Sequence, residues 1–205
     1  LDFIPSAERT GLIVEIGAWV IDQSCAILAR WAKSPATAHL SLAVNVSARQ
    51  FHRADFAAEV GKALARNKID GTRLKLELTE SLALENVAES TARMQELRSM
   101  GIQLSLDDFG TGQSSLYYLK QLPLSQIKID QSFVRDISTD PNDAVLVKTI
   151  IGMAENLRLE VIAEGVETEA QLSFLRENGC HLYQGYLFSR PISVAEFEMR
   201  SENWD

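Results

Sequence analysis

Apolar residues follow two periods that alternate along this chain. Across residues 12–33 an apolar side chain recurs every three or four positions, which is the spacing of an amphipathic helix. Short runs rich in leucine, isoleucine and valine predict buried strands between such helices. The expected strands are residues 40–46, 74–78, 102–106, 127–130 and 159–163, with a sixth at 183–186. The expected helices are residues 12–33, 56–64, 87–97, 114–122, 141–157 and 168–179, and one more that begins after Ser193.

Local signals mark where several of these helices begin and end. Asp140 and Pro141 provide an N-cap and a first-turn proline, and Thr168 with Gln171 has the spacing of a capping box. Gly101 ends the helix of residues 87–97. These boundaries leave no long linker, so we expect residues 1–205 to form a single domain.

Alternation of strands and helices predicts a parallel sheet covered by helices. A doubly wound sheet would collect its ligand groups at one switch point, but polar residues follow every strand here. We therefore predict an α/β fold, a TIM-like (β/α) barrel whose active face is lined by all strands in turn. At 205 residues the chain is short for a barrel, which fits one that lacks a unit. Because it opens on Leu1 and not on methionine, we expect it to be part of a longer polypeptide.

Composition narrows the classes of partner. The net charge of −8 and the pI near 5.0 disfavour broad electrostatic binding to DNA, RNA or an anionic membrane. No apolar run is long enough to cross a bilayer, so we expect a cytoplasmic domain. Other domains of the longer protein could still attach it to the membrane. Cys25 and Cys180 lie far apart and predict reduced core thiols, not a disulfide.

Oxygen-bearing side chains fall at the carboxyl ends of five successive strands, or within two residues of them. They are Asn45, Glu77, Asp107, Asp130 and Glu164. A barrel would bring them to one mouth, and oxygen donors without a Cys/His cluster suit Mg²⁺ or Mn²⁺. The adjacent Asp107 and Asp108 could bridge two such ions for in-line attack on a phosphate ester. Any one of these acids alone is more often an N-cap or a solvated loop residue, but caps do not require acids at five strand ends.

Lys128 is a second candidate, because alternation places it on the same face as Asp130. A lysine that points into a barrel mouth needs an anionic partner to offset its desolvation. One interpretation is a structural ion pair with Asp130. The other is an ammonium that orients a nucleophilic water or stabilises charge on phosphate.

Several further residues receive structural interpretations. Glu80 and Glu167 are expected to hold the loops that follow their strands, and Gly110 with Gly112 permits a tight turn. Tyr117 and its neighbour Tyr118 are expected to pack in the core. The three histidines are expected to be surface or packing residues: His39, His52 and His181.

With these residues in hand, the chain resembles the EAL domain, a bacterial phosphodiesterase family that hydrolyses cyclic di-GMP. The matching motifs occur in order along the whole chain: Asn45-Val-Ser47, Glu77-Leu-Thr-Glu80, Asp107-Asp-Phe-Gly-Thr-Gly112, Lys128-Ile-Asp130, Glu164-Gly-Val-Glu167, Gln184-Gly-Tyr186 and Ser189-Arg-Pro191. Gln113, where the family often has an aromatic residue, is a minor departure.

The resemblance implies a modified TIM barrel and cleavage of cyclic di-GMP to linear pGpG with two Mg²⁺ or Mn²⁺ ions. By the resemblance, the ligands of the first metal ion are Asn45, Glu77, Asp107 and Asp130, and Asp108 binds the second ion with Asp107 bridging the two. Glu164 acts as the general base or as a metal ligand, Lys128 positions the water, and Gln184 contacts the phosphate or the water. Glu80 supports the loop that begins at Asp107, and the border of a guanine pocket is formed by Ser189, Arg190 and Pro191. A homodimer is implied as well, since the loop that begins at Asp107 lies near the dimer interface in this family.

One departure affects the expected activity. The family's Glu-x-Leu-x-Arg strand, which supplies a metal ligand and an arginine for the substrate, is absent from the 205 residues. We therefore expect a barrel without its first strand and little or no hydrolysis from this chain alone. The competing hypotheses are a non-catalytic receptor for cyclic di-GMP or for a partner protein, and a phosphodiesterase for another nucleotide.

Overall fold

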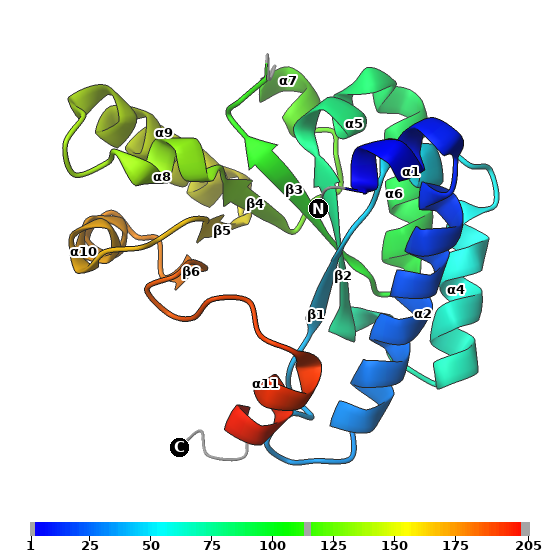
Figure 1. The fold of residues 1–205 in the computed structure, drawn as a ribbon. Coiled ribbons are helices and arrows are strands. Elements are labelled where there is room, and N and C mark those ends of the chain that lie inside the picture. Colours follow the sequence, from blue (N-terminus) through cyan, green and yellow to red (C-terminus); the bar gives the residue numbers. More distant parts are fainter. Residues whose placement is uncertain (1–2, 113–115, 202–205) are drawn as a thin grey trace.

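The fold is an open, curled sheet with helices outside it, seen in a computed structural model that describes residues 3–112 and 116–201 (Figure 1). Six parallel strands pair in sequence order: β1 (Leu42–Asn45), β2 (Leu74–Thr79), β3 (Gln103–Phe109), β4 (Gln126–Ile129), β5 (Glu160–Ala163) and β6 (Leu182–Tyr183). The predicted TIM-like architecture is confirmed in the form of a half-barrel with β1 and β6 at its edges.

The helices follow the expected order, with short additions. Five lie close to the predicted ranges, namely α2 (Ile13–Trp31), α4 (Phe56–Asn67), α6 (Val87–Ser99), α9 (Pro141–Leu157) and α10 (Glu169–Glu177). The final helix is α11 (Val194–Ser201). The helix expected at 114–122 is found as α7 (Leu116–Leu119), which is shorter than predicted because residues 120–122 form a turn and a bend; residues 114–115 lie outside the described residues. Four short helices have no counterpart in the sequence-based prediction: α1 (Ile4–Thr10), α3 (Ala48–Phe51), α5 (Glu80–Glu85) and α8 (Gln131–Arg135). Gln113 lies outside the described residues.

Alternation along β2, β3 and β4 separates an apolar outer face from a polar inner face. In β2, Leu74, Leu76 and Leu78 are fully buried toward the helices, whereas Lys75 and Glu77 point to the concave side. Burial of one such leucine contributes about 2 kcal/mol. The outer faces therefore hold the core together and leave the inner faces for polar chemistry.

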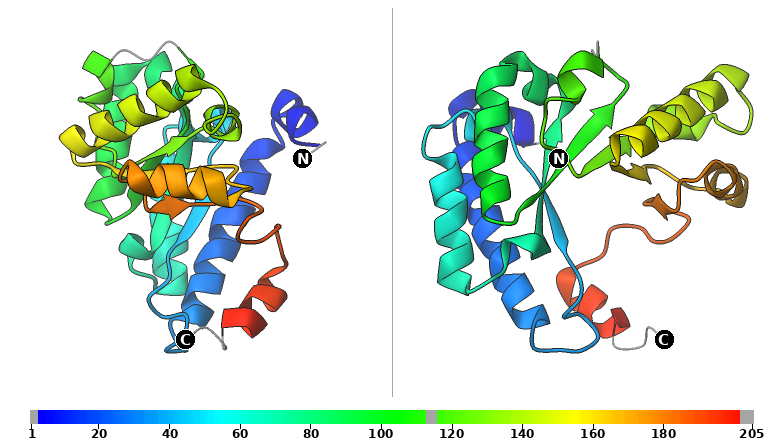
Figure 2. Two further views of the ribbon diagram at one scale, coloured as in Figure 1. Left: turned by 90° about the vertical axis from the view of Figure 1, so that its left-hand side faces the viewer. Right: turned by 180° about the vertical axis from the view of Figure 1, so that it is seen from behind.

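Two groups of helices cover the outside of the sheet. Figures 1 and 2 show α2, α4 and α6 side by side along the β1–β3 half, whereas α9 and α10 flank the β4–β6 half. Among the described helices, none is by itself long and apolar enough to span a bilayer, and only the pair α1 and α2, bent by 119°, meets that criterion together.

The last helix returns to the first long one. The Phe197 ring of α11 stacks on Trp31 of α2 with 5.1 Å between ring centroids. Glu198 accepts hydrogen bonds from the Arg30 guanidinium at 3.0 Å and from the Trp31 indole at 2.9 Å. Residues from opposite ends of the sequence therefore share one contact below β1, where Figure 1 shows α11.

The two cysteines are buried and free, as expected. Cys25 and Cys180 belong to the apolar core, and burial raises the pKa of both thiols to about 11. Both side chains therefore remain protonated thiols at neutral pH.

In contrast, the expectation that Tyr117 and Tyr118 pack in the core is wrong. Their exposed fractions are 70% and 43%, and their rings contact each other edge to face on α7. The amphipathic nature of tyrosine permits this exposure, so an aromatic pair does not by itself indicate a core position.

Candidate active site

The carboxyl ends of the strands bring the predicted polar residues to one rim. Asn45 of β1 pairs in register with Glu77 of β2, and Asp107 of β3 pairs with Thr79. Glu164 follows β5, where its N–H donates to the Ile129 carbonyl of β4. Parallel pairing therefore places the carboxyl ends of five consecutive strands at the same edge, which is the arrangement that a parallel barrel imposes.

Lys128 lies at the centre of this rim. Its Nζ is 2.8 Å from Glu77 Oε2, 3.0 Å from Asp107 Oδ1 and 2.6 Å from Glu164 Oε1. Only 4% of the lysine side chain is exposed. Burial acts to lower the pKa of Lys128, but hydrogen bonds to Glu164 and Glu77 outweigh it and the pKa is raised. The ammonium is therefore charged and bound to carboxylates from three other strands or strand ends.

The alternative interpretation of Lys128, an ion pair with Asp130, is not observed among the described residues. Asp130 instead caps α8, where its Oδ1 accepts hydrogen bonds from the Ser132 N–H at 2.9 Å and from the Ser132 hydroxyl. The lysine side chain reaches across the sheet to Glu77, and the aspartate begins the next helix. Asp130 thus has a structural function in addition to any ligand function.

Three carboxylates meet beside the lysine. Asp107, Asp108 and Glu164 each place one oxygen within 4.8 Å of the others. Burial and the neighbouring Asp107 and Asp130 raise the pKa of Asp108, while Lys128 opposes the shift. Burial also raises the pKa of Glu164, again against the effect of Lys128. Mutual repulsion of partly buried carboxylates is relieved by a divalent cation, so this donor set fits Mg²⁺ or Mn²⁺.

The double aspartate has an unusual backbone. Asp108 has a φ of +54°, and the register between β3 and β4 shifts between Leu106 and Phe109. The Asp108 N–H donates to Asp107 Oδ1 at 3.1 Å. Aspartate tolerates the left-handed region better than most residues, and this bulge turns both carboxylates toward the rim.

Glu80, the first residue of α5, holds the loop that follows the double aspartate. Its side chain is buried, and its Oε2 accepts a hydrogen bond from the Gly110 N–H at 3.0 Å. A Cβ on Gly112 would lie 2.5 Å from Glu80 Oε1, so the loop approaches this carboxylate closely. Glu167 acts through its backbone instead, since its N–H donates to Gln171 Oε1 at 2.8 Å.

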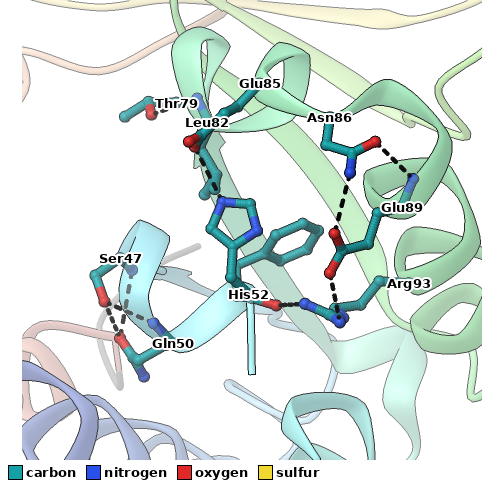
Figure 3. Close-up of polar contacts among 10 residues, drawn as sticks. Ser47, Gln50, His52, Thr79, Leu82, Glu85, Asn86, Glu89 and Arg93 are labelled. Carbon is teal, nitrogen blue, oxygen red and sulfur yellow. Dashed lines mark hydrogen bonds and ion pairs between the residues drawn. The ribbon is translucent and has the colours of Figure 1, made fainter. Parts of the chain in front are cut away.

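Polar contacts behind the rim, which the sequence interpretation missed, connect α3, α5 and α6 (Figure 3). Ser47 and Gln50 form a capping box at the start of α3, directly after the Asn45 strand. His52 Nε2 lies 3.1 Å from Glu85 Oε2 of α5. Arg93 of α6 donates to the carbonyl that precedes His52. The spacing of Ser47 and Gln50 was a readable signal, whereas the two contacts between helices have none in the sequence.

A cavity opens beside Glu164. Its volume is about 560 Å³, and its walls include Gln184, Ser189, Arg190 and Pro191. Gln184 Nε2 donates to Glu164 Oε1 at 2.7 Å, and the Arg190 guanidinium lies 4.4 Å from the centroid of the neighbouring Tyr186 ring. A cavity of this size with a few convergent polar groups suits a small-molecule ligand.

Comparison with known proteins gives consistent matches. The model of the family described as "EAL domain" matches residues 1–191. The chain is 45% identical over 194 residues to the bifunctional diguanylate cyclase/cyclic di-GMP phosphodiesterase MucR of Pseudomonas aeruginosa, which is 95% of this chain and 28% of that protein. It is 44% identical over 196 residues to the cyclic di-GMP phosphodiesterase NbdA of the same species, which is 96% of this chain and 25% of that protein.

Solved structures agree with these matches. The complex of the P. aeruginosa MucR phosphodiesterase with cyclic di-GMP superposes with a TM-score of 0.92 at 43% identity, covering 96% of this chain and 79% of that one. The manganese and cyclic di-GMP complex of Klebsiella pneumoniae BlrP1 gives a TM-score of 0.77 at 28% identity, covering 90% and 45%. The chain spans about a quarter of the length of the two curated relatives.

Proposed function

Because the chain belongs to the EAL domain family, we propose that it carries the catalytic rim of a metal-dependent phosphodiesterase that hydrolyses cyclic di-GMP to linear pGpG. The carrying observation is the convergence of Asp107, Asp108 and Glu164 around Lys128, at the edge of a cavity of about 560 Å³. The names of the two relatives support the reaction, and the donor set supports the cofactor.

The residues of the rim divide into those that hold metal and those that handle the reacting water. Two Mg²⁺ or Mn²⁺ ions, when bound, would neutralise charge on the phosphate and lower the pKa of water. The residues proposed to hold them are Asn45, Glu77, Asp107 and Asp130 for one ion and Asp108 with the shared Asp107 for the other. Asn45 is exposed at the end of β1, beside Glu77, where an amide oxygen is accessible to an ion.

Glu164 is proposed as the general base. Its pKa is raised by burial, which brings its basicity closer to that suited to neutral pH. In the reaction the water oxygen forms a bond to phosphorus, Glu164 takes the proton, the bond from phosphorus to the 3′ oxygen breaks, and the 3′ oxygen takes a proton from solvent to leave as a hydroxyl. Lys128 and Gln184, which both contact Glu164 Oε1, hold that carboxylate and the water in position.

Substrate contacts are proposed for the cavity wall. Gln184 would contact the phosphate or the water, and Ser189, Arg190 and Pro191 would border a guanine base. The planar guanidinium of Arg190 suits hydrogen bonding to a base or a phosphate. We also propose a cytoplasmic domain that assembles as a homodimer, which sedimentation of the purified protein would check.

The test measures pGpG release with Mn²⁺ from the longer polypeptide and from this chain, each as wild type and as Glu164→Ala. In the longer polypeptide the substitution should abolish release and leave the circular dichroism spectrum unchanged. Glu155→Ala, on the exposed face of α9, is the matched control and should retain activity. We expect weak or no release from the 205 residues alone, because they contain no Glu-x-Leu-x-Arg sequence. Tight binding of cyclic di-GMP by the longer polypeptide without hydrolysis would contradict the proposal and support a receptor.

A further inference from the structure

The positive charge at the centre of the rim is the ammonium of Lys128. Three carboxylates surround one ammonium, with Lys128 Nζ at 2.6–3.0 Å from Glu164, Asp107 and Glu77. The four side chains are between 4% and 15% exposed. An ammonium has three N–H donors, and here three carboxylate oxygens lie within 3.0 Å of the nitrogen. Lys128 therefore places one positive charge among three carboxylates, where a divalent ion would place two.

The ligands of this ammonium overlap with those of the proposed metal site. Glu77 and Asp107 are proposed first-metal ligands, and Glu164 is one of the three clustered carboxylates. Without the lysine, these acids would face one another at low exposure, which disfavours the folded state. With it, one oxygen of each acid is held within 3.0 Å of the same nitrogen.

We propose that Lys128 is the built-in counterion of the metal site: it holds Glu77, Asp107 and Glu164 together in the metal-free domain and competes with a divalent ion for their oxygens. Lys128 is thus a positioning residue for the site before metal binds, in addition to its proposed contact with water. The competition with metal rests on the proposed function, but the stabilisation of the metal-free domain does not.

Lys75 provides a matched control on the same strand face. It lies two residues before Glu77 in β2, its side chain is 13% exposed, and its only ion pair in the described part of the chain is with Glu160 at 3.7 Å. Lys75 is thus a largely buried lysine of the same sheet with one distant acid where Lys128 has three close ones. Replacement of either lysine by methionine removes a charge and keeps much of the volume.

The experiment records thermal unfolding of the whole chain with EDTA and with saturating Mn²⁺, and Mn²⁺ affinity by calorimetry. We expect Lys128→Met to lower the metal-free melting temperature by about 10 °C, because loss of one partner leaves buried charges uncompensated. The gain on adding Mn²⁺ should exceed the wild-type gain. Mn²⁺ should bind on the order of tenfold more tightly, which is the effect of removing a unit charge about 5 Å from a dication even in water.

Two comparisons separate a counterion from a packing residue. Lys128→Arg retains the charge and should restore much of the metal-free stability, while Lys75→Met should show the wild-type gain with Mn²⁺. If Lys128→Met shows the wild-type melting temperature in EDTA, or the wild-type gain and affinity with Mn²⁺, the counterion role is wrong.

If Lys128→Met does not fold, a second substitution in the same chain tests the proposal. Glu77→Gln removes one of the three negative charges, so the double variant Glu77→Gln/Lys128→Met should recover folding in EDTA. Failure of that double variant to fold would overturn the proposal. Absence of Mn²⁺ binding by the wild type would count against the phosphodiesterase instead, and the comparison in EDTA would still decide the role of Lys128.

Discussion

Replacement of Glu80 by alanine should loosen the loop that carries the double aspartate. Glu80 is buried and accepts a hydrogen bond from the Gly110 N–H at 3.0 Å. A hydrogen bond to a charged group contributes about 1.5–3 kcal/mol, which corresponds to roughly a 10- to 150-fold change in the equilibrium between closed and open loop. If only the closed loop presents Asp107 and Asp108 together, the affinity for Mn²⁺ should fall by a similar factor.

The assay is hydrogen exchange of the Gly110 amide, followed by NMR, together with a Mn²⁺ titration of the same sample. In the Glu80→Ala variant the amide should exchange roughly 10 to 150 times faster than in the wild type. Glu85→Ala is the matched control on α5, since the Glu85 side chain is 67% exposed and its contact with His52 should contribute about 0–1 kcal/mol. Unchanged exchange at Gly110 in Glu80→Ala would refute the assigned link between α5 and the loop.

Two further predictions concern stability. A Cβ on Gly185 would lie 2.1 Å from the Val166 carbonyl oxygen, so Gly185→Ala should lower the free energy of unfolding by about 1–3 kcal/mol. Nothing lies within 4 Å of a Cβ on Gly152, so Gly152→Ala is the control and should not destabilise the fold. Urea denaturation measures both variants. Hydrogen bonds from Arg30 and from the indole beside it lower the pKa of Glu198, so this carboxylate stabilises the fold above its unfolded pKa and loses that contribution as the pH falls through the lowered folded value. Glu198→Gln should therefore lower the free energy of unfolding at about pH 7 and lower it less at about pH 3. An equal decrease at both pH values would contradict the assignment.

The strands were readable from the sequence because burial on the outer face leaves a direct pattern. Leu74, Leu76 and Leu78 alternate with polar residues, and β2 is found within one residue of the prediction. The short helices were not readable, since four to seven residues are too few to show a helical period. Their positions depend on caps such as Ser47 and Thr79, which are common in loops as well.

The rim was readable to the extent that strand order determines it. A parallel arrangement places Glu77 and Asp107 at one edge regardless of side-chain detail. The partners of Lys128 were not readable, because they come from strands 51, 21 and 36 residues away and depend on reach across the concave face. Alternation alone indicated only Asp130, the neighbour on the same strand.

The return of α11 to α2 bears on the order in which the domain assembles. The bond between Trp31 and Glu198 joins residues 167 positions apart, and closing so long a loop costs more chain entropy than pairing neighbouring strands. Adjacent strands with their crossover helices can form first, while this contact waits until residues 194–201 are available. During synthesis on the ribosome, the Trp31 ring therefore stays without its aromatic partner until nearly the whole segment has emerged, and its fluorescence would report the final docking step.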